Sequence, residues 1–310
     1  MKSTILIGDA RKRLAELPAG SARTCVTSPP YFGLRDYGEA DQIGLEETPD
    51  AYVAEMVELF REVWRVLADD GTLWLNLGDS YAGNNSRASD NGRAGYGNER
   101  EGVFKRGGEG LKNKDLIGIP WRVAFALQAD GWYLRSDIIW HKPNPMPESV
   151  TDRPTKSHEY LFLLTKSPRY YYDHEAIKEP SVTNTEGQSI RFGGSKYGDS
   201  TDPKHATKSG NIYEDTGKRN KRDVWTINTK PFKGAHFAVM PEALVEPCVL
   251  AGSQEGDTVL DPFTGSGTVA VVANRLGRNF VGTELNPEYG EIAKNRITDS
   301  DPMFNEVEIV

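Results

Sequence analysis

The amino-acid sequence predicts an α/β protein with a mainly parallel, twisted sheet that carries helices on both faces. Short apolar runs that end in small polar residues alternate with segments of helical periodicity. This alternation is typical of parallel strands that are joined by crossover helices. The length of 310 residues is enough for one large domain with insertions. The first two runs, "STILIGD" at residues 3–9 and "ARTCVTS" at 22–28, are predicted to be strands.

A helix is predicted over residues 49–71, followed by a strand. Apolar side chains such as Tyr52, Met56 and Phe60 recur on one helical face, and the pattern stops at Gly71. Further elements follow the same two periodicities. They are strands at 72–80, 133–142, 158–167, 257–263 and 279–285, and helices at 119–132, 241–253, 266–277 and 287–297.

Two segments interrupt this pattern. Residues 83–114 are rich in glycine and cannot bury enough apolar surface to order themselves, so a mobile loop is predicted there. Residues 173–230 are polar and weakly patterned, which is typical of an inserted subdomain. Segments 86–114 and 181–222 each carry a net charge of +3, whereas the whole chain carries −8. Such positive segments are compatible with nucleic-acid binding, although solvated loops of mixed charge explain them equally well.

Composition excludes several classes of protein. No apolar run approaches the roughly 20 residues that a membrane-spanning helix needs. The apolar stretch near the start is too short for the core of a signal peptide. Cys25 and Cys248 are too few for a disulfide framework or a metal cluster. We therefore expect a cytoplasmic, reduced protein without a bound metal.

The segment "VLDPFTGSGTVAVVANRLGRNFVGTEL", residues 259–285, predicts a nucleotide-binding turn. Gly265, Gly267 and Ala270 match the spacing G-x-G-x-x-G/A, and Glu284 follows Gly265 by 19 residues. Such glycines let the backbone approach a ligand, and the acidic residue binds ribose hydroxyls. The pattern fits an NAD enzyme as well as another adenosine-binding protein, and a tight packing turn is the structural alternative.

Two details favour S-adenosyl-L-methionine over NAD. A dinucleotide needs a second mononucleotide-binding half, and only 26 residues follow Glu284. Asp261 and Phe263 stand at the end of the preceding strand, where a carboxylate can hold an ammonium group and a ring can line an adenosine or sulfonium pocket. S-adenosyl-L-methionine carries an ammonium group, a sulfonium and ribose hydroxyls, but it has no pyrophosphate.

The segment "TSPPY", residues 27–31, is interpreted as the site of an amine acceptor. The exocyclic amine of cytosine or adenine is a poor nucleophile, because its lone pair is delocalised into the ring. The Ser28 hydroxyl and the Pro29 carbonyl can accept its two N–H bonds and direct the lone pair at a methyl group. Pro29 and Pro30 hold these acceptors rigidly, and Tyr31 can stack on a base that has left the duplex. Taken alone, the diproline is compatible with an ordinary loop turn.

Together, "TSPPY" and "DPFTGSGT" (residues 261–268) resemble the amino-methylating DNA methyltransferases. The order, with the catalytic segment first and the cofactor segment last, is that of their β group and implies a circularly permuted methyltransferase fold. The resemblance implies S-adenosyl-L-methionine as the cofactor and an inserted DNA-recognition region. It divides the chain into a catalytic half at 1–174, a target-recognition insertion at 175–232 and a cofactor-binding half at 233–310.

The resemblance also implies roles for single residues. Asp9 is expected near the cofactor or the target base. Ser28 favours cytosine-N4 methylation, because Asp or Asn is typical at this position of adenine-N6 enzymes, and adenine-N6 methylation remains the alternative. The expected catalytic residues are Ser28, Pro29, Pro30 and Tyr31. The expected cofactor-binding residues are Asp9, His236, Phe237, Asp261, Pro262, Phe263, Gly265, Ser266, Gly267, Thr268 and Glu284.

The expected partner is double-stranded DNA, which the inserted region would bind mainly through phosphates. A cognate restriction endonuclease and a second copy of the chain are further partners that the resemblance allows. Two other classes of function remain open on the residues alone, namely a nicotinamide oxidoreductase and a catalytically idle DNA-binding protein. The expected DNA-binding residues are Arg191, Lys196, Lys204, Lys208, Lys218, Arg219, Lys221 and Arg222.

Overall fold

The computed structural model divides into two compact units, residues 1–173 with 223–310, and residues 174–222. Each unit is described by itself. The described residues are 1–34, 38–39, 41–83, 111–181, 189–192, 211–214, 217–229, 239–302 and 305–310. The predicted mobile loop at 83–114 falls almost entirely outside them, since residues 84–110 are not described.

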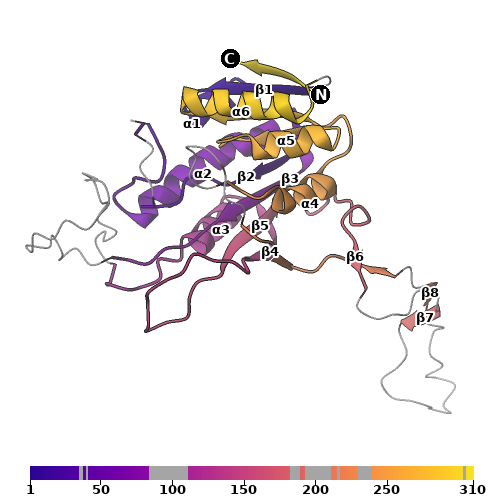
Figure 1. Ribbon diagram of the computed structural model, residues 1–310, viewed down its shortest axis with the longest axis horizontal. Coiled ribbons are helices and arrows are strands. Elements are labelled where there is room, and N and C mark those ends of the chain that lie inside the picture. Colours follow the sequence, from indigo (N-terminus) through magenta and orange to yellow (C-terminus); the bar gives the residue numbers. More distant parts are fainter. Residues whose placement is uncertain are drawn as a thin grey trace, which may run out of the picture. The chain divides into compact units, whose positions relative to one another are not determined.

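The larger unit contains a nine-stranded sheet (Figure 1). β5 (His158–Thr165) runs antiparallel to both of its neighbours, whereas the other neighbouring strands of this sheet are parallel. The prediction of a mainly parallel sheet is therefore confirmed. In spatial order the strands are β10 (Val224–Thr226), β4 (Tyr133–His141), β5 (His158–Thr165), β3 (Leu67–Leu77), β2 (Ala22–Thr27), β11 (Thr258–Asp261), β12 (Asn279–Glu284), β1 (Lys2–Ile7) and β13 (Glu306–Ile309).

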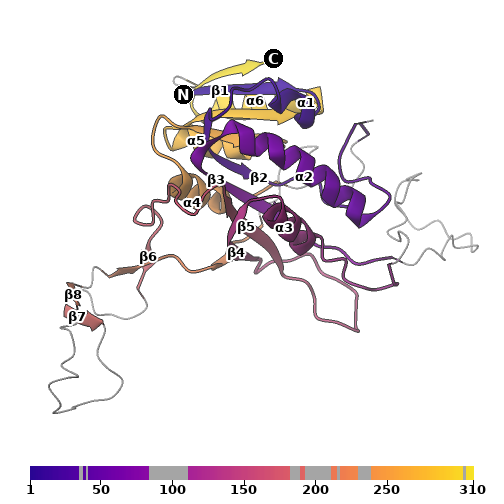
Figure 2. The same cartoon turned by 180° about the vertical axis from the view of Figure 1, so that it is seen from behind.

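Helices cover both faces of this sheet, as predicted. α1 (Ala10–Leu14) contacts α2 (Pro49–Val66), and α2 contacts α3 (Ile119–Ala129), on one face, which Figure 2 shows in front. α4, α5 and α6 form the corresponding layer on the other face, in front in Figure 1. No described helix has the length and apolar character that crossing a bilayer requires. The helices are α1 (Ala10–Leu14), α2 (Pro49–Val66), α3 (Ile119–Ala129), α4 (Glu242–Gly252), α5 (Thr268–Arg275) and α6 (Pro287–Ser300).

Helix α2 shows how the sequence produces one of these elements. The Thr48 hydroxyl caps its first turn by accepting the Ala51 N–H at 3.1 Å, and the predicted apolar face is fully buried. The helix ends at Val66, earlier than predicted, because Leu67 adopts extended dihedral angles and pairs with Ala22 of β2. The predicted 49–71 helix is thus too long, and its last residues begin β3.

The smaller unit contains two short antiparallel ladders. β6 (Glu179–Pro180) pairs with β9 (Lys218–Arg219), and β7 (Ser189–Phe192) pairs with β8 (Asn211–Glu214). The unit ends at Arg222. The expected insertion at 175–232 therefore extends too far, because β10 already pairs with β4 in the main sheet.

Candidate active site

A cavity of about 790 Å³ lies at one edge of the main sheet. The turns that follow β1, β2, β11 and β12 line it, and these turns stand at the carboxyl ends of parallel strands. β5 contributes its amino end, which reaches the same edge because this strand runs in the opposite direction. Ligands of open α/β sheets bind at this edge, and the volume is in the range of small-molecule sites.

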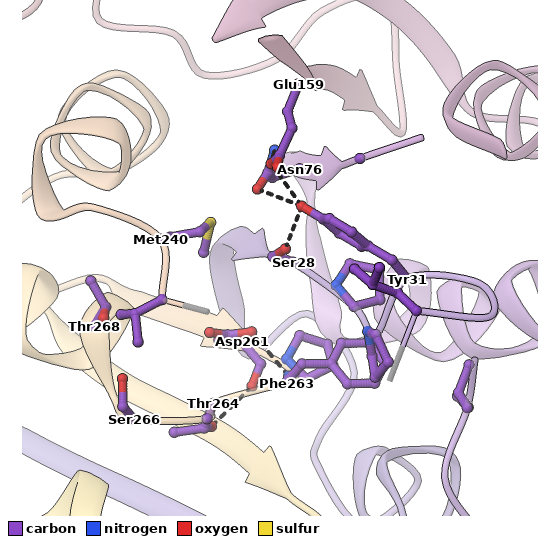
Figure 3. A pocket seen from close by; sticks show the side chains of 18 of the residues that line it. Ser28, Tyr31, Asn76, Glu159, Met240, Asp261, Phe263, Thr264, Ser266 and Thr268 are labelled. Atoms are coloured by element: carbon purple, nitrogen blue, oxygen red, sulfur yellow. Dashed lines mark hydrogen bonds between the residues drawn. The ribbon is translucent and has the colours of Figure 1, made fainter. Parts of the chain in front are cut away.

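The two motifs singled out from the sequence meet in this cavity. β2 and β11 are adjacent, with Leu260 paired to Cys25. The Thr27 hydroxyl at the end of β2 donates a hydrogen bond of 2.6 Å to Asp261 at the end of β11. Ser28 follows Thr27 directly and lines the same cavity as Asp261 (Figure 3). A group bound by one motif can therefore face a group bound by the other.

Asp261 is a buried carboxyl group with a raised pKa. It is 2% exposed and also accepts the Phe263 N–H at 3.0 Å. Burial raises the pKa of Asp261 to about 7, although the hydrogen bonds from Thr27 and Phe263 favour the ionised form. Such a carboxyl group gains most from a cation that enters the cavity, because the cation compensates for the water that burial removed.

The glycine turn between β11 and α5 has the backbone that its sequence predicts. Gly265 and Gly267 have φ values of +51° and +78°, in the region that favours glycine. The Glu284 carboxylate accepts the Gly265 N–H at 2.8 Å and the Asn286 N–H at 3.0 Å, and burial raises its pKa. Gly265 lines the cavity, whereas Gly267 packs closely on Ala293 of α6.

A hydrogen bond from α2 fixes the Ser-Pro-Pro-Tyr segment. The Tyr52 hydroxyl donates a hydrogen bond of 2.9 Å to the Pro30 carbonyl. This contact fixes the turn that presents Ser28 and Pro29 to the cavity, where both residues are among the lining groups. The predicted catalytic segment therefore has a fixed backbone, as the positioning of an amine requires.

Tyr31 is more deeply engaged than the sequence suggests. Its hydroxyl lies 2.8 Å from Glu159 Oε2, 3.2 Å from Asn76 Oδ1 and 3.4 Å from the Ser28 hydroxyl. Burial raises the pKa of Tyr31 well above its usual value of 10. Its ring packs on Gly78, where an added Cβ would lie 2.5 Å from Tyr31 Cε2. The residue thus lines the cavity with its hydroxyl already bonded (Figure 3).

Glu159 was not expected in the site, and neither were Asn76 and Lys142, which bond it together with Tyr31. Asn76 of β3 donates to Glu159 Oε2 at 3.3 Å, and the Lys142 ammonium forms an ion pair with Glu159 Oε1. The sequence signal is a charged residue in the otherwise apolar strand "HEYLFLL". That signal marks an unusual position in a strand. It does not place Glu159 in the cavity, because the amino end of β5 lies there only when this strand is antiparallel to its neighbours.

Asp9 lines the cavity, and Arg11 binds the Asp9 carboxylate. The Arg11 guanidinium donates to both carboxylate oxygens and contacts Glu55 at 2.6 Å. Burial acts to raise the pKa of Asp9, but the hydrogen bonds from Arg11 outweigh it, and the pKa lies below its ordinary value. Asp9 is therefore ionised and oriented at the cavity wall.

The other expected site residues divide into two groups. Pro262, Phe263, Ser266 and Thr268 line the cavity. His236 and Phe237 lie outside the described residues, as do Lys196, Lys204 and Lys208, and only the backbone of Arg191 is described.

Arg219 and Arg222 belong to the smaller unit, in which both contact Glu179, at 2.9 and 2.7 Å. Lys218 lies beside Arg219 in β9 and is exposed, and Lys221 is half-buried. Among the residues that the structure describes, no group of three His, Cys, Asp or Glu side chains is arranged to hold a metal ion.

A family model and several curated relatives match most of the chain. A family model described as DNA methylase, of the N6/N4 methyltransferase group, matches residues 22–295. Type II methyltransferase M.Cfr9I of Citrobacter freundii is 51% identical over 301 residues, which cover 96% of this chain and 89% of that protein. Type II methyltransferase M.SmaI of Serratia marcescens is 51% identical over 295 residues, which cover 94% of this chain and 90% of that protein.

Solved structures also resemble the chain along nearly its whole length. The putative DNA modification methylase TTHA0409 of Thermus thermophilus, solved in complex with S-adenosyl-L-methionine, has a TM-score of 0.61 at 25% identity and covers 99% of this chain and 98% of that one. The PvuII DNA methyltransferase, named as cytosine-N4-specific, has a TM-score of 0.63 and covers 99% and 96%. At 17% identity the second likeness concerns the fold alone.

The permuted α/β fold and its two-motif cavity define a methyltransferase that depends on S-adenosyl-L-methionine. The chain belongs to the DNA methylase family of N6/N4 methyltransferases. This membership confirms the resemblance found in the sequence and decides against the nicotinamide oxidoreductase. The cavity residues fit the methyl donor. A buried carboxyl group suits the ammonium group of the donor, and a second carboxylate suits its ribose hydroxyls. The glycine turn suits the close approach of its adenosine to the backbone.

Proposed function

We propose that this protein transfers a methyl group from S-adenosyl-L-methionine to the exocyclic N4 amine of cytosine in double-stranded DNA. One observation carries the proposal: Ser28 and Asp261 line one cavity, and Thr27 links their strands through a 2.6 Å hydrogen bond. The donor half and the acceptor half of a transfer site therefore face each other.

The donor half consists of residues from the turns after β11 and β12. The Asp261 carboxylate would hold the ammonium group, and Glu284 would accept hydrogen bonds from the ribose hydroxyls while it keeps its two backbone N–H partners. Phe263 would line the adenosine. The donor supplies a methyl group on a positively charged sulfur. Pro262, Gly265, Ser266 and Thr268 complete this wall.

The acceptor half orients the amine. Ser28 Oγ and the Pro29 carbonyl would accept its two N–H bonds, which biases the nitrogen toward a tetrahedral geometry with its lone pair directed at the donor. Serine is too weak a base to remove a proton at neutral pH, so these residues act by positioning and electrostatics. The Tyr31 ring would contact the flipped base and offset part of the unstacking penalty.

The choice of base rests on Ser28. A serine at the first position of this segment is typical of cytosine-N4 enzymes in the family that the sequence resembles. Asp or Asn in its place is typical of adenine-N6 enzymes. The curated relatives are named as Type II methyltransferases, and their names do not state a base. We infer N4-cytosine for this chain from the serine alone.

We further infer that DNA contacts come from the smaller unit. Lys218, Arg219, Lys221 and Arg222 would contact phosphates, which gives affinity without sequence information. The Type II names of the relatives also support action beside a cognate restriction endonuclease.

The proposal is tested by identifying the modified base. Plasmid DNA is incubated with the protein and S-adenosyl-L-methionine, digested to nucleosides and analysed by mass spectrometry, and the sites are then located by sequencing. We expect N4-methylcytosine in one short sequence context. N6-methyladenine would show that the inference from Ser28 is wrong, and DNA without any added methyl group would indicate a catalytically idle DNA-binding protein.

A further inference from the structure

Glu159 places an acidic group in a cavity that must admit anionic DNA. Its side chain is 16% exposed and lies at the amino end of β5. Lys142 balances its charge, and the same ammonium group lies 4.2 Å from the centroid of the Trp140 ring, which holds it in place. The proposed transfer assigns no role to this carboxylate, although it lies 2.8 Å from the hydroxyl of Tyr31 in the catalytic segment.

The direction of each hydrogen bond around Tyr31 follows from the chemistry of the partners. A carboxylate can only accept, so Tyr31 donates its single proton to Glu159. The raised pKa of Tyr31 keeps this proton on the phenol. Asn76 supports the arrangement, because its amide donates to Glu159 at 3.3 Å and to the Tyr160 carbonyl at 3.0 Å.

The direction of the hydrogen bond from Tyr31 to Glu159 also determines how Ser28 bonds. Since the Tyr31 proton points to Glu159, the Tyr31 oxygen offers a lone pair to the Ser28 hydroxyl at 3.4 Å. The distance is long for an O–H···O bond, as catalytic hydrogen bonds often are before the substrate binds. Once Ser28 donates to Tyr31, both serine lone pairs are available to accept an N–H bond from the target amine.

We propose that Glu159 is a positioning residue that acts through Tyr31 and makes Ser28 Oγ a hydrogen-bond acceptor toward the target amine. The inference rests on the proposed amine transfer and holds for cytosine or adenine. It gives a reason for a carboxylate beside the catalytic segment, where Lys142 neutralises its charge and so reduces its repulsion of DNA.

The substitution Glu159→Gln should reverse the direction of the hydrogen bonds that link this side chain, Tyr31 and Ser28. Lys142 can only donate, so it would take the amide oxygen of the new side chain and leave the NH₂ group facing Tyr31. That NH₂ group would donate to the Tyr31 oxygen and compete with Ser28 for it, and the Tyr31 proton would turn toward Ser28 Oγ or Asn76 Oδ1. We expect the single-turnover rate at saturating donor and DNA to fall by about 100-fold, the usual penalty for a misoriented reacting group.

Two second-site variants separate this role from a structural one. In a Tyr31→Phe background, which itself should be slow, adding Glu159→Gln should cause no further loss, because the route through the hydroxyl is already absent. Adding Lys142→Met to Glu159→Gln should restore part of the rate. Without the ammonium group, the donors Tyr31 and Asn76 would draw the amide oxygen back to their side.

The matched control is Glu62→Gln, which breaks a Glu62–Arg65 pair on α2 outside the cavity and should keep the wild-type rate. Donor affinity should be unchanged in the Glu159→Gln and Tyr31→Phe variants, and both should unfold cooperatively above the assay temperature. A wild-type rate in either variant would overturn the inference, and so would additive losses in the double variant. The nucleoside that the wild type produces tests the proposed base separately, so the two failures are distinguishable.

Discussion

At the scale of single residues, we expect Asp261 to make the proposed donor site sensitive to pH near neutrality. Its pKa in the folded protein is about 7, above the ordinary value of 3.8. The stabilisation that this carboxyl group gives to the ligand-free fold is therefore complete below about pH 3.8 and is lost as the pH rises through about 7. A bound ammonium group reverses this preference, because it favours the ionised carboxylate.

We therefore expect donor affinity to increase between about pH 5.5 and about pH 7, with proton release on binding that is largest at the acidic end. Titration calorimetry in buffers of different ionisation enthalpy measures both quantities. The control is Asp261→Asn, which should bind the donor more weakly and with little dependence on pH over this range. An unchanged pH profile in that variant would mean that another group titrates.

At the scale of elements, the turn after β3 positions the Tyr31 ring. Gly78 leaves room for that ring, and the added methyl group of Gly78→Ala would overlap Tyr31 Cε2 at 2.5 Å. We expect this variant to displace the Tyr31 hydroxyl and to lower the transfer rate at least about 10-fold, as small displacements of positioning groups do. Asp261 is held by hydrogen bonds from Thr27 and Phe263 rather than by Tyr31, so donor affinity should be retained. Equal weakening of donor binding would contradict the assignment.

Most elements could be predicted from the sequence because each follows from its own residues. The apolar face of α2 and the short apolar runs of β2 and β11 carry periodic signals that do not depend on partners. α1 and β13 were missed, since α1 has only five residues and β13, "EVEI", has no apolar run and buries none of its side chains fully.

The direction and neighbours of a strand are set by contacts between distant segments. β5 has an apolar sequence like that of the parallel strands, yet it runs antiparallel to β3 and β4. The consequence for the site is direct. Ser28 and Asp261 could be found from motifs, whereas Glu159 reaches the cavity only because the direction of β5 brings its amino end there. A residue whose role depends on sheet topology has no local signature.

At the scale of the whole molecule, an acidic protein of net charge −8 must still bind DNA. The proposed contacts lie in the smaller unit, where Glu179 already engages two arginines. We expect Lys218→Ala to weaken DNA binding and to reduce the slope of log K against log[salt] by about 0.9, the value for one lost phosphate contact.

Fluorescence anisotropy with a labelled duplex over a series of salt concentrations measures this slope. Lys2→Ala is a suitable control, because it removes a lysine of β1 that pairs with Glu308 in the other unit. If the two variants changed the slope equally, the smaller unit would have no special part in binding phosphates.

The permuted order of the chain also belongs to this scale. The catalytic segment follows an early strand and the donor segment follows a late one, and the sheet places β2 directly beside β11. The proposed transfer site therefore requires the complete sheet. Neither half of the sequence contains both walls of the cavity.

The most direct test compares Ser28→Ala with the wild type in a single turnover with saturating labelled donor, together with the donor dissociation constant of each. We expect the variant to lose at least about 100-fold in transfer rate, because one of two amine acceptors is removed, and to bind the donor as tightly as the wild type. A variant that transfers methyl groups at the wild-type rate would contradict a site in which the Ser28 hydroxyl holds the target amine.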